Sequence, residues 1–500
     1  MSLKAFAARI FAASVHRRNR RWIQHPIQAQ RKLFQHIIRQ GASTQFGRDH
    51  QFDTIRNPED FARQVPVRDY EDLKPYVNQI LEGQANVLWP GRPLYLAKTS
   101  GTTSGAKYIP ITDVSIKAQV GASRDAILNY IHRTGRSSFV DGKMIFLQGS
   151  PELQEKNGMK IGRLSGISAH YVPGYLQRNR LPSWETNCME DWEAKVDKIV
   201  AETLPENMTV IAGIPSWVQM YFEKIQDQTG KAVGEVFPNL ELFIYGGVNF
   251  EPYRARFESL LGRKVASIEL FPASEGFFAY QDQDQEPGML LLTDAGIFYE
   301  FIEADKFYDE NPRRLTLEQV QMGVNYAMII STDAGLWAYN LGDTIAFTSL
   351  KPYRVIVTGR IKHFISAFGE HVIAKEVETA LQEGLKAVAA DVNEFTVAPV
   401  ISPKDGELPF HEWLIEFESV PQKLEEMARV IDRSMQAQNS YYADLLEGNI
   451  LQPLKITCIA PGGFRNFMKL QGKLGGQHKV QRLSNDRKVA EGLAPYRISP

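Results

Sequence analysis

The chain contains the stretch Thr99-Ser100-Gly101-Thr102-Thr103-Ser104-Gly105-Ala106-Lys107. Five hydroxyl side chains and two glycines occupy its first seven positions, and a lysine ends it. Apolar segments at 93–97 and 108–111 flank the stretch, and their aromatic and β-branched residues predict two short strands joined by a loop. Glycines let a backbone point successive N–H groups at one spot, while the hydroxyls add donors and the lysine adds charge. The pattern is typical of a loop that binds a polyphosphate.

The spacing excludes a Walker A loop, in which four residues separate the first Gly from a Gly-Lys-Ser/Thr ending. Here three residues separate Gly101 from Gly105, and Tyr108 follows Lys107. A hydroxyl-rich surface loop without a ligand is the other interpretation. We rank it lower because nine residues in this order, with these flanks, are unusual for such a loop.

The order of residues resembles the phosphate loop of adenylate-forming enzymes, the superfamily of acyl-CoA synthetases, peptide-synthetase adenylation domains and luciferases. Its continuation, Lys107-Tyr108-Ile109-Pro110-Ile111-Thr112, is similar to the auxin-responsive Gretchen Hagen family of acyl acid amido synthetases, in its bacterial branch. The wider superfamily usually has Gly where Ser104 stands and Pro where Ala106 stands. This departure argues against an ordinary acyl-CoA synthetase and not against ATP binding.

Composition limits the remaining classes. The chain has 500 residues, 43% apolar and 23% charged, which is ordinary for a soluble protein of two domains or more. A formal net charge of -1 gives no overall field for nucleic acid. Two distant cysteines support neither a disulfide framework nor a cysteine metal site, so a reducing, cytoplasmic location is expected. No segment is long and apolar enough to span a bilayer. The basic run 17–21 is interpreted as a solvated helix face, with a membrane or RNA contact as the alternative.

The fold class predicted is α/β. Strands at 143–148, 208–212, 240–245 and 265–270 alternate with helices, which favours parallel sheets. From Ala327 strands dominate, as in an antiparallel subdomain. We place a domain boundary at the end of the strand 353–360. The prediction is a large N-terminal domain of mixed α/β layers over 1–358, which binds ATP and the acyl group. A small α+β lid over 359–500 follows it and carries a catalytic lysine.

Two further motifs follow predicted strands. Gly246-Gly247 is a turn that can bring backbone close to a flat base, or an ordinary strand end. In the segment Leu270-Phe271-Pro272-Ala273-Ser274-Glu275-Gly276, the resemblance implies that the backbone and side chains stack on adenine and that Glu275 holds Mg²⁺. One carboxylate suffices because Mg²⁺ prefers few carboxylates plus phosphate oxygens and water. A solvated Glu275 is the alternative.

Three more residues match functional positions of the resembling families. Asp343, in Tyr339-Asn340-Leu341-Gly342-Asp343, matches the carboxylate that accepts the ribose hydroxyls. Arg360, 17 residues later, matches an arginine near the ribose or phosphate, with a surface arginine as the alternative. Lys479, in Gly472-Lys473-Leu474-Gly475-Gly476-Gln477-His478-Lys479-Val480, matches the catalytic lysine. Lys473 is the second candidate, and a flexible basic tail is the alternative to both.

Three residues are candidates for substrate binding. Arg124 projects from the helix predicted at 116–134, where a guanidinium can grip a carboxylate in bidentate fashion. An exposed helical arginine is the alternative. Ile214-Pro215-Ser216-Trp217 resembles a family segment that lines the acyl site. Trp217 and Tyr221 are therefore candidates for its wall, with core packing an equally good interpretation.

The resemblance implies a two-step ligase. An acyl carboxylate attacks ATP to give an acyl-adenylate and pyrophosphate, and an amine, an amino acid by expectation, then displaces AMP. The implied cofactors are ATP and Mg²⁺, the chain is expected to be monomeric, and Gly359 is the hinge candidate. An acyl-CoA ligase using the same intermediate and a non-catalytic nucleotide-binding protein remain as alternatives. The sequence identifies neither the acid nor the amine.

Overall fold

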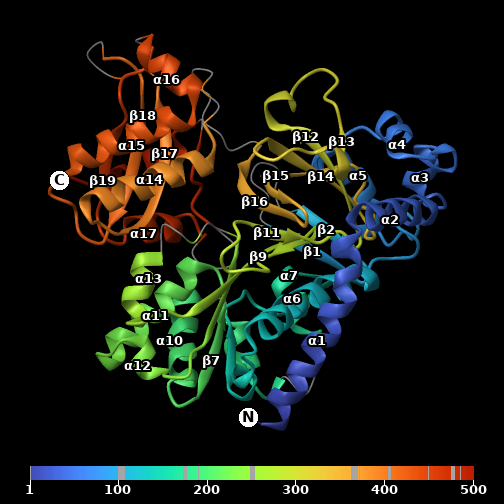
Figure 1. Ribbon diagram of the computed structural model, residues 1–500, viewed down its shortest axis with the longest axis horizontal. Helices are drawn as coiled ribbons and strands as arrows, with labels where there is room; N and C mark the ends of the chain where they lie inside the picture. The colour runs from blue at the N-terminus through green and yellow to red at the C-terminus, as the bar shows by residue number, and fades with distance from the viewer. Residues whose placement is uncertain are drawn as a thin grey trace. The chain divides into compact units, whose positions relative to one another are not determined.

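The computed structural model describes residues 2–99, 107–172, 177–189, 191–247, 250, 254–361, 370, 372–401, 403, 407–448, 450–473, 479–484 and 486–499 (Figure 1). The chain separates into two compact units. Unit 1 comprises Met1–Val248 and Lys264–Ile356, and unit 2 comprises Asn249–Arg263 and Val357–Pro500. The predicted α/β class is confirmed.

A twelve-stranded sheet dominates unit 1, in the order β13-β12-β14-β15-β16-β11-β10-β9-β8-β7-β3-β6. One end of this sheet is parallel, as the alternation of strands and helices predicted. Its strands are β3 (Lys143–Phe146), β6 (Arg180–Leu181), β7 (Met208–Ala212), β8 (Leu242–Gly246) and β9 (Ala266–Ala273).

The other end is antiparallel, which confirms the change of pattern predicted from Ala327. Its strands are β10 (Gly276–Tyr280), β11 (Met289–Leu291), β12 (Ile297–Glu303), β13 (Leu315–Thr316), β14 (Asn325–Thr332), β15 (Tyr339–Leu350) and β16 (Tyr353–Arg360). The sequence did not show that both halves form one sheet, joined by the β9–β10 hairpin.

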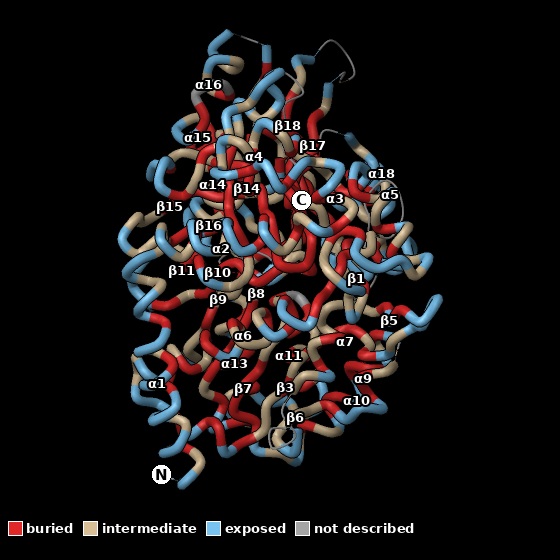
Figure 2. The backbone as a smooth tube through the Cα atoms, turned by 90° about the vertical axis from the view of Figure 1, so that its right-hand side faces the viewer, coloured by how far each residue is buried: buried red, intermediate tan, exposed pale blue. Residues whose placement is uncertain are grey.

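Helices cover the parallel strands because these strands are apolar on both faces. Strand β7 reads Met-Thr-Val-Ile-Ala and is buried over its first four residues. Residues of α6 (Asp113–Thr134) pack with β7, β8 and β9 in one apolar cluster. Helix α1 (Leu3–Gln24) packs on α6, and Figure 2 shows it mostly in the pale blue of exposed residues. Further helices are α7 (Leu164–Ala169), α9 (Trp184–Cys188), α10 (Trp192–Thr203), α11 (Pro215–Thr229) and α12 (Val233–Val236).

A second, four-stranded sheet has the order β2-β1-β5-β4. Strands β1 (Tyr95–Thr99) and β2 (Lys107–Ile111) are antiparallel neighbours, so the predicted strand–loop–strand arrangement is confirmed. The other two strands are β4 (Gln154–Lys156) and β5 (Met159–Gly162). Helix α6 begins directly after β2, where the Thr112 side chain accepts a hydrogen bond from the Ser115 N–H at 3.1 Å.

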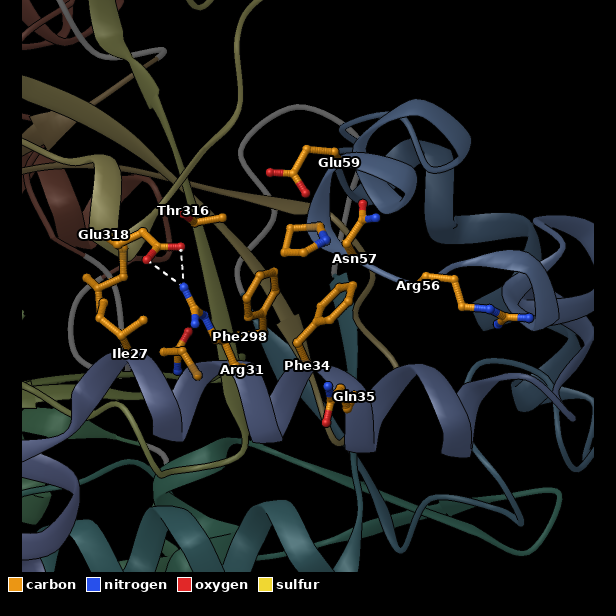
Figure 3. A pocket seen from close by; sticks show the side chains of 13 residues that line it. Ile27, Arg31, Phe34, Gln35, Arg56, Asn57, Glu59, Phe298, Thr316 and Glu318 are labelled. Atoms are coloured by element: carbon orange, nitrogen blue, oxygen red, sulfur yellow. Dashed lines mark hydrogen bonds and ion pairs between the residues drawn. The ribbon is translucent and has the colours of Figure 1, made fainter.

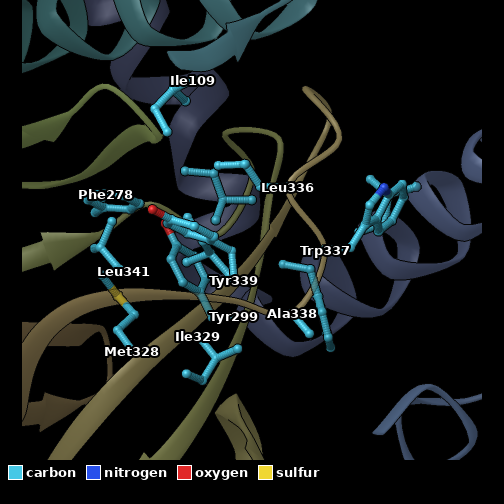
Figure 4. Close-up of a cluster of buried hydrophobic side chains, with 14 of the residues drawn as sticks. Ile109, Phe278, Tyr299, Met328, Ile329, Leu336, Trp337, Ala338, Tyr339 and Leu341 are labelled. Carbon is cyan, nitrogen blue, oxygen red and sulfur yellow. The ribbon is translucent and has the colours of Figure 1, made fainter. Parts of the chain in front are cut away.

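The largest apolar cluster joins the antiparallel strands to the N-terminal helices. Trp337 is fully buried in this cluster (Figure 4). Its Nε1 donates to the Leu88 carbonyl at 3.0 Å. Strands dominate from Ala327 as predicted, but Trp337 precedes β15, which begins only at Tyr339, and Ala338 has a φ of +47°. The N-terminal helices are α2 (Pro26–Gly41), α3 (Gln45–Asp49), α4 (Pro58–Gln64) and α5 (Tyr70–Leu81).

Unit 2 is an α+β module, as predicted, around a sheet of order β17-β18-β19-β20. The strands are β17 (Val392–Val400), β18 (Phe410–Phe417), β19 (Lys455–Ile459) and β20 (Arg497–Ile498). The helices are α13 (Arg254–Leu261), α14 (Ala374–Val388), α15 (Leu424–Gln438), α16 (Ser440–Glu447), α17 (Gly463–Leu470) and α18 (Lys488–Gly492). Across the described residues of both units, no helix combines the length and apolarity needed to cross a membrane.

Candidate functional site

The β1–β2 hairpin carries the predicted phosphate loop. Thr99 pairs with Lys107 in register, so these two residues close the hairpin. Four predicted phosphate-binding residues lie outside the described residues: Ser100, Gly101, Thr102 and Thr103. The Lys107 Nζ lies 5.7 Å from the centroid of the Tyr70 ring, whose hydroxyl accepts the Tyr108 N–H at 2.9 Å. The base of the hairpin is thereby fixed against helix α5.

The carboxyl ends of β3, β7, β8 and β9 meet at one edge of the large sheet, because these strands are parallel neighbours. The segments that leave this edge are 147–151, 213–214, 246–247 and 274–275. Ligands of α/β sheets bind at such an edge. Two of the predicted motifs therefore follow neighbouring strands, β8 and β9, at an edge where a ligand can bind.

Gly246 ends β8 in close contact with β9. It pairs with Leu270, and a Cβ built on Gly246 would lie 2.4 Å from the Leu270 carbonyl oxygen. Gly247 is exposed with a φ of +84°, a conformation that glycine adopts without strain. The predicted strand-ending turn is present, and only glycine fits its first position.

The segment 271–275 forms the end of β9 and a two-residue hairpin turn. Ala273 pairs with Gly276, so the turn consists of Ser274 and Glu275. The Phe271 ring is buried 5.0 Å from the Phe278 ring, whereas Pro272 is exposed. Ala273 is half-buried, Ser274 is buried and Glu275 is half-buried.

The donor set at this turn fits magnesium only together with phosphate and water. One carboxylate, that of Glu275, stands at the turn. Within the described ranges, no group of three or more His, Cys, Asp or Glu residues suits a metal ion. Mg²⁺ is commonly held by one or two carboxylates plus substrate phosphates, so Glu275 suits a metal that arrives with a nucleotide.

Asp343 lies in a bulge of β15. The pairing with β14 shifts between Asn340 and Thr344, so the three intervening residues oppose Met328 alone. Gly342 has a φ of +88°, and its N–H donates to the Asn340 side-chain oxygen at 2.9 Å. Bulges re-aim side chains next to binding sites. The half-buried Asp343 is thus presented by an irregularity that the Leu-Gly-Asp sequence permits.

Three predicted residues belong to unit 2. Arg360 is exposed at the end of β16, directly after Gly359, whose φ is +151°. Lys479 is exposed, and the chain that follows it is fixed, since the Arg482 carbonyl accepts the Val397 N–H at 2.9 Å. Lys473 is exposed just beyond α17. Both candidate lysines therefore remain accessible.

The Arg124 guanidinium contacts its own helix and α1. It donates to the Asp125 carboxylate at 2.7 Å and lies 5.7 Å from the Phe11 ring centroid. Arg124 also lines a cavity of about 740 Å³ formed by α1, α2, α6 and the β-strand ends beside them. In this structure the Arg124 guanidinium thus pairs with the carboxylate of Asp125. A role for Arg124 in binding a substrate carboxylate stays a prediction.

The structure places Trp217 and Tyr221 against α10. Trp217 is buried with its ring 4.6 Å from that of Trp192. Tyr221 is fully buried, and its hydroxyl donates to the Thr203 hydroxyl at 2.7 Å. Burial raises the pKa of the Tyr221 hydroxyl above its usual value. The burial and hydrogen bond of Tyr221 agree with core packing, one of the two interpretations of this pair.

Another cavity, of about 360 Å³, lies between α2, α4 and β12 (Figure 3). Phe34 and Phe298 face each other in it, and Arg31 pairs with Glu318 at its side. None of the predicted site residues lines this cavity.

Three cations near the end of β3 were not among the residues predicted from the sequence: Arg163, Arg180 and Lys195. Lys195 had a detectable signal. It lies three residues after Trp192 on the buried face of α10, where an apolar residue is expected. The other two had none, because Arg163 precedes the six-residue helix α7 and Arg180 begins the two-residue strand β6.

Comparisons with known proteins agree with this arrangement. The sequence matches the GH3 family N-terminal domain over residues 16–179, its central domain over 290–360 and its C-terminal domain over 375–488. A jasmonoyl–L-amino acid synthetase of Nicotiana attenuata is 20% identical, over 81% of this chain and 82% of the relative. An indole-3-acetic acid-amido synthetase of Arabidopsis thaliana is 22% identical, over 94% and 93%.

Solved structures give the same fold. The GH3.15 acyl acid amido synthetase superposes with a TM-score of 0.81 at 15% identity, over 98% of this chain and 97% of that one. A 2-hydroxyisobutyryl-CoA ligase in its postadenylation state superposes with a TM-score of 0.62 at 13% identity, over 93% and 90%. The named sequence relatives are from plants, so the narrower assignment to a bacterial branch has no support.

Proposed function

Because this chain belongs to the GH3 family, we propose that it joins an acyl acid to an amine, an amino acid in the simplest case, with ATP as the source of energy. In the first step the acyl carboxylate oxygen attacks the α-phosphorus of ATP, and pyrophosphate leaves. In the second step the amine attacks the acyl carbon, loses a proton and displaces AMP. The plant relatives are named for reactions of this kind with jasmonate and indole-3-acetate.

The observation that carries this proposal is the match of three successive GH3 domains in order. Two of the nucleotide motifs also follow the neighbouring strands β8 and β9. Gly246 pairs with Leu270, so the glycine turn lies beside β9 four residues before the Ser274–Glu275 turn. At about 3.3 Å per residue the two turns are about 13 Å apart along β9, so a nucleotide that contacts both would lie along the end of this strand. Adenine would lie along the Gly246-Gly247 and 271–274 backbones, and Mg²⁺ with the phosphates would lie at Glu275.

The remaining roles follow from charge. Thr99, Ser100, Gly101, Thr102 and Thr103 would bind the β- and γ-phosphates. Catalysis of adenylation is mainly positioning and charge neutralisation, which suits donors and cations rather than a base. Asp343 would accept the ribose hydroxyls, and Arg360 would approach the ribose or phosphate.

Lys479 would stabilise the charge that develops on the phosphate during adenylation. The N-terminal domain, 1–358, would hold ATP and the acyl group, and the C-terminal domain, 359–500, would carry Lys479 as a lid. We propose that this lid turns about Gly359 between the two steps, since glycine accepts large backbone changes.

The setting is part of the same proposal. The chain would work as a monomer in the cytoplasm with Mg²⁺. Both cysteines, Cys188 and Cys458, are free, which suits a reducing compartment.

A divided phenotype tests the two-step scheme. Lys479→Ala should lower acid-dependent ATP–pyrophosphate exchange by about a hundredfold or more, the usual cost of a lost transition-state contact. Amide formation from a supplied acyl-adenylate should stay near the wild-type rate, because that step does not need the lysine. Lys473→Ala is the matched control and should leave both rates unchanged. Equal loss of both rates in Lys479→Ala would contradict the two-position scheme.

The acceptor needs its own experiment, because a CoA ligase shares the fold. A pyrophosphate-release screen over acyl acids should first identify an acid that supports adenylation. Amino acids, hydroxylamine and CoA are then offered separately. Amide formation with thioester absent supports the proposal, and thioester formation with amide absent refutes it.

A further inference from the structure

Three basic side chains surround the segment that leaves β3. The Lys195 Nζ donates to the carbonyl oxygens of Gln148 and Asn187, at 3.0 and 2.7 Å. With its amide turned so that both ends are satisfied, Gln148 accepts a hydrogen bond from the Arg180 Nη2 at 2.6 Å. A Cβ on the next residue, a glycine, would lie 2.7 Å from the Arg163 Nη1. We call Arg163, Arg180 and Lys195 the β3 cation cluster.

Among the residues that the structure describes, none places a carboxylate oxygen within 4.0 Å of the three side-chain cations of this cluster. The other buried cations of unit 1 do have such partners: Arg314 pairs with Glu300, and Arg354 with Asp282. Buried charges in proteins are normally paired, so the cluster is prepared for a negative charge from outside.

Burial has a measurable cost here. Desolvation lowers the pKa of Lys195 to about 8 and lowers the pKa of Arg180 from its usual value. Lys195 is 1% exposed, whereas Arg163 and Arg180 keep part of their surface. The cluster is therefore accessible from the side of the two arginines.

Unpaired hydrogen-bond donors accompany the cations. Arg180 Nε, the Ser165 hydroxyl and the Trp192 indole N–H are buried without a partner. Trp192 is 5% exposed, and the Lys195 Nζ lies 6.0 Å from the centroid of its ring. Buried donors that are left unsatisfied destabilise the folded chain. An anion with several acceptor oxygens would satisfy donors of this kind.

The cluster lies where the parallel strands end, at the edge where the proposed function places the nucleotide. The Leu147 N–H after β3 donates to the Ala212 carbonyl at 2.8 Å, so the ends of β3 and β7 are adjacent. Strand β8, which ends at Gly246, is the next one along. Two strand spacings amount to about 10 Å. A substrate whose reacting end lies by the β8 turn would therefore extend a remote group to the β3 cation cluster.

We propose that the β3 cation cluster binds a carboxylate that a substrate carries away from its reacting end. The inference rests on the proposed function for the identity of the substrates. Two sources supply such a group: a second carboxylate on the acyl acid, or the α-carboxylate of the amino acid acceptor. Arg163 and Arg180 contact the anion, and Lys195 holds the segment and adds positive charge.

Kinetics with matched substrate pairs test the proposal and separate the sources. Adipate, suberate and sebacate are each compared with the monomethyl ester in pyrophosphate release, and amino acids are compared with their amides in amide formation. Arg163→Met and Arg180→Met should raise KM for the carboxylate-bearing partner of one pair about tenfold to hundredfold, with kcat little changed. The neutral partner should change less than twofold. Lys198→Met is the matched control, because Lys198 is exposed on α10, the helix that carries Lys195.

A binding readout separates this proposal from the proposed function. Suberate should raise the Tm of the wild type and of Lys198→Met but not of Arg163→Met, and the diamide of suberate should raise none. If no acid drives pyrophosphate release while this pattern holds, the proposed function fails and the anion site stands. The inference is overturned if the arginine variants affect both members of every pair equally, or if suberate shifts all proteins alike. If Arg180→Met fails to fold, Arg163→Met still tests the proposal, because Arg163 is partly exposed.

Discussion

The carboxyl group of Asp333 should make unit 1 less stable as the pH rises. Asp333 follows β14 and is 5% exposed. A Cβ built on Gly296 would lie 2.2 Å from its Oδ2, so the carboxyl group packs against bare backbone. Burial raises the pKa of Asp333 from 3.8 to about 7, and only the hydrogen bond from its own N–H opposes this.

The sign follows from the protons bound in each state. Between the two pKa values the folded chain keeps a proton that the unfolded chain has lost, so the free energy of unfolding falls as pH rises. This contribution is intact below the unfolded pKa of 3.8 and is lost by the time pH passes the folded pKa of about 7. A gap of about three pH units, at ~1.36 kcal/mol each, costs about 4 kcal/mol at about pH 8.

Asp333→Asn removes the titrating group and keeps its shape. Urea unfolding followed by tryptophan fluorescence should show the variant and the wild type equal near pH 4, with the variant about 4 kcal/mol more stable near pH 8. Asp305→Asn, at an exposed position, is the control and should change nothing at either pH. A stability difference that is the same at both pH values, or a ¹³C-carboxyl titration of Asp333 near its ordinary pKa, would refute the reasoning.

Three other variants follow from single contacts. Gly246→Ala puts a methyl group against the β9 carbonyl, so it should lower the free energy of unfolding in urea by about 1–3 kcal/mol and weaken ATP binding. Gly121→Ala, in helix α6 where there is room for a Cβ, should raise the free energy of unfolding by up to ~1 kcal/mol. Arg314→Met leaves Glu300 buried without its partner and should cost about 3–5 kcal/mol, most of it recovered when Glu300→Leu is added. Tyr221→Phe removes one buried hydrogen bond, so stability should fall by about 1 kcal/mol while KM for the acyl acid stays constant, and a changed acid preference would place the tyrosine in the substrate site.

Local patterns predicted most elements of the fold. The strand predicted at 208–212 has these bounds, and the helix predicted from 116 to 134 begins three residues earlier because Thr112 caps it. The prolines over 53–76 predict short helices and turns, and the structure has them, although Pro75 lies inside α5. Trp337 has a strand-like composition but precedes β15, so there tertiary packing overrides a local preference.

Local sequence signals for the candidate site are clearest where polar or glycine residues follow a predicted strand. Gly246 and Glu275 have sequence signals because a strand, a glycine and a carboxylate occur in order. The bulge that presents Asp343 depends on pairing with β14, which no local pattern shows. The β3 cation cluster brings together residues from three separate segments of the chain. Whether carboxylates neutralise its positive charges can therefore be seen only in the three-dimensional structure.

The β9–β10 hairpin also has a consequence for how the chain reaches its native state. On the antiparallel side most paired strands are close in sequence, whereas β3 and β7 are separated along the chain by a segment that contains α7, α9 and α10. Contacts of short sequence separation form early, and distant ones carry a larger loop-closure entropy. We therefore expect the antiparallel strands to pair before the parallel ones. The β9–β10 hairpin, whose turn carries Glu275, lies at the boundary between the two halves of the sheet.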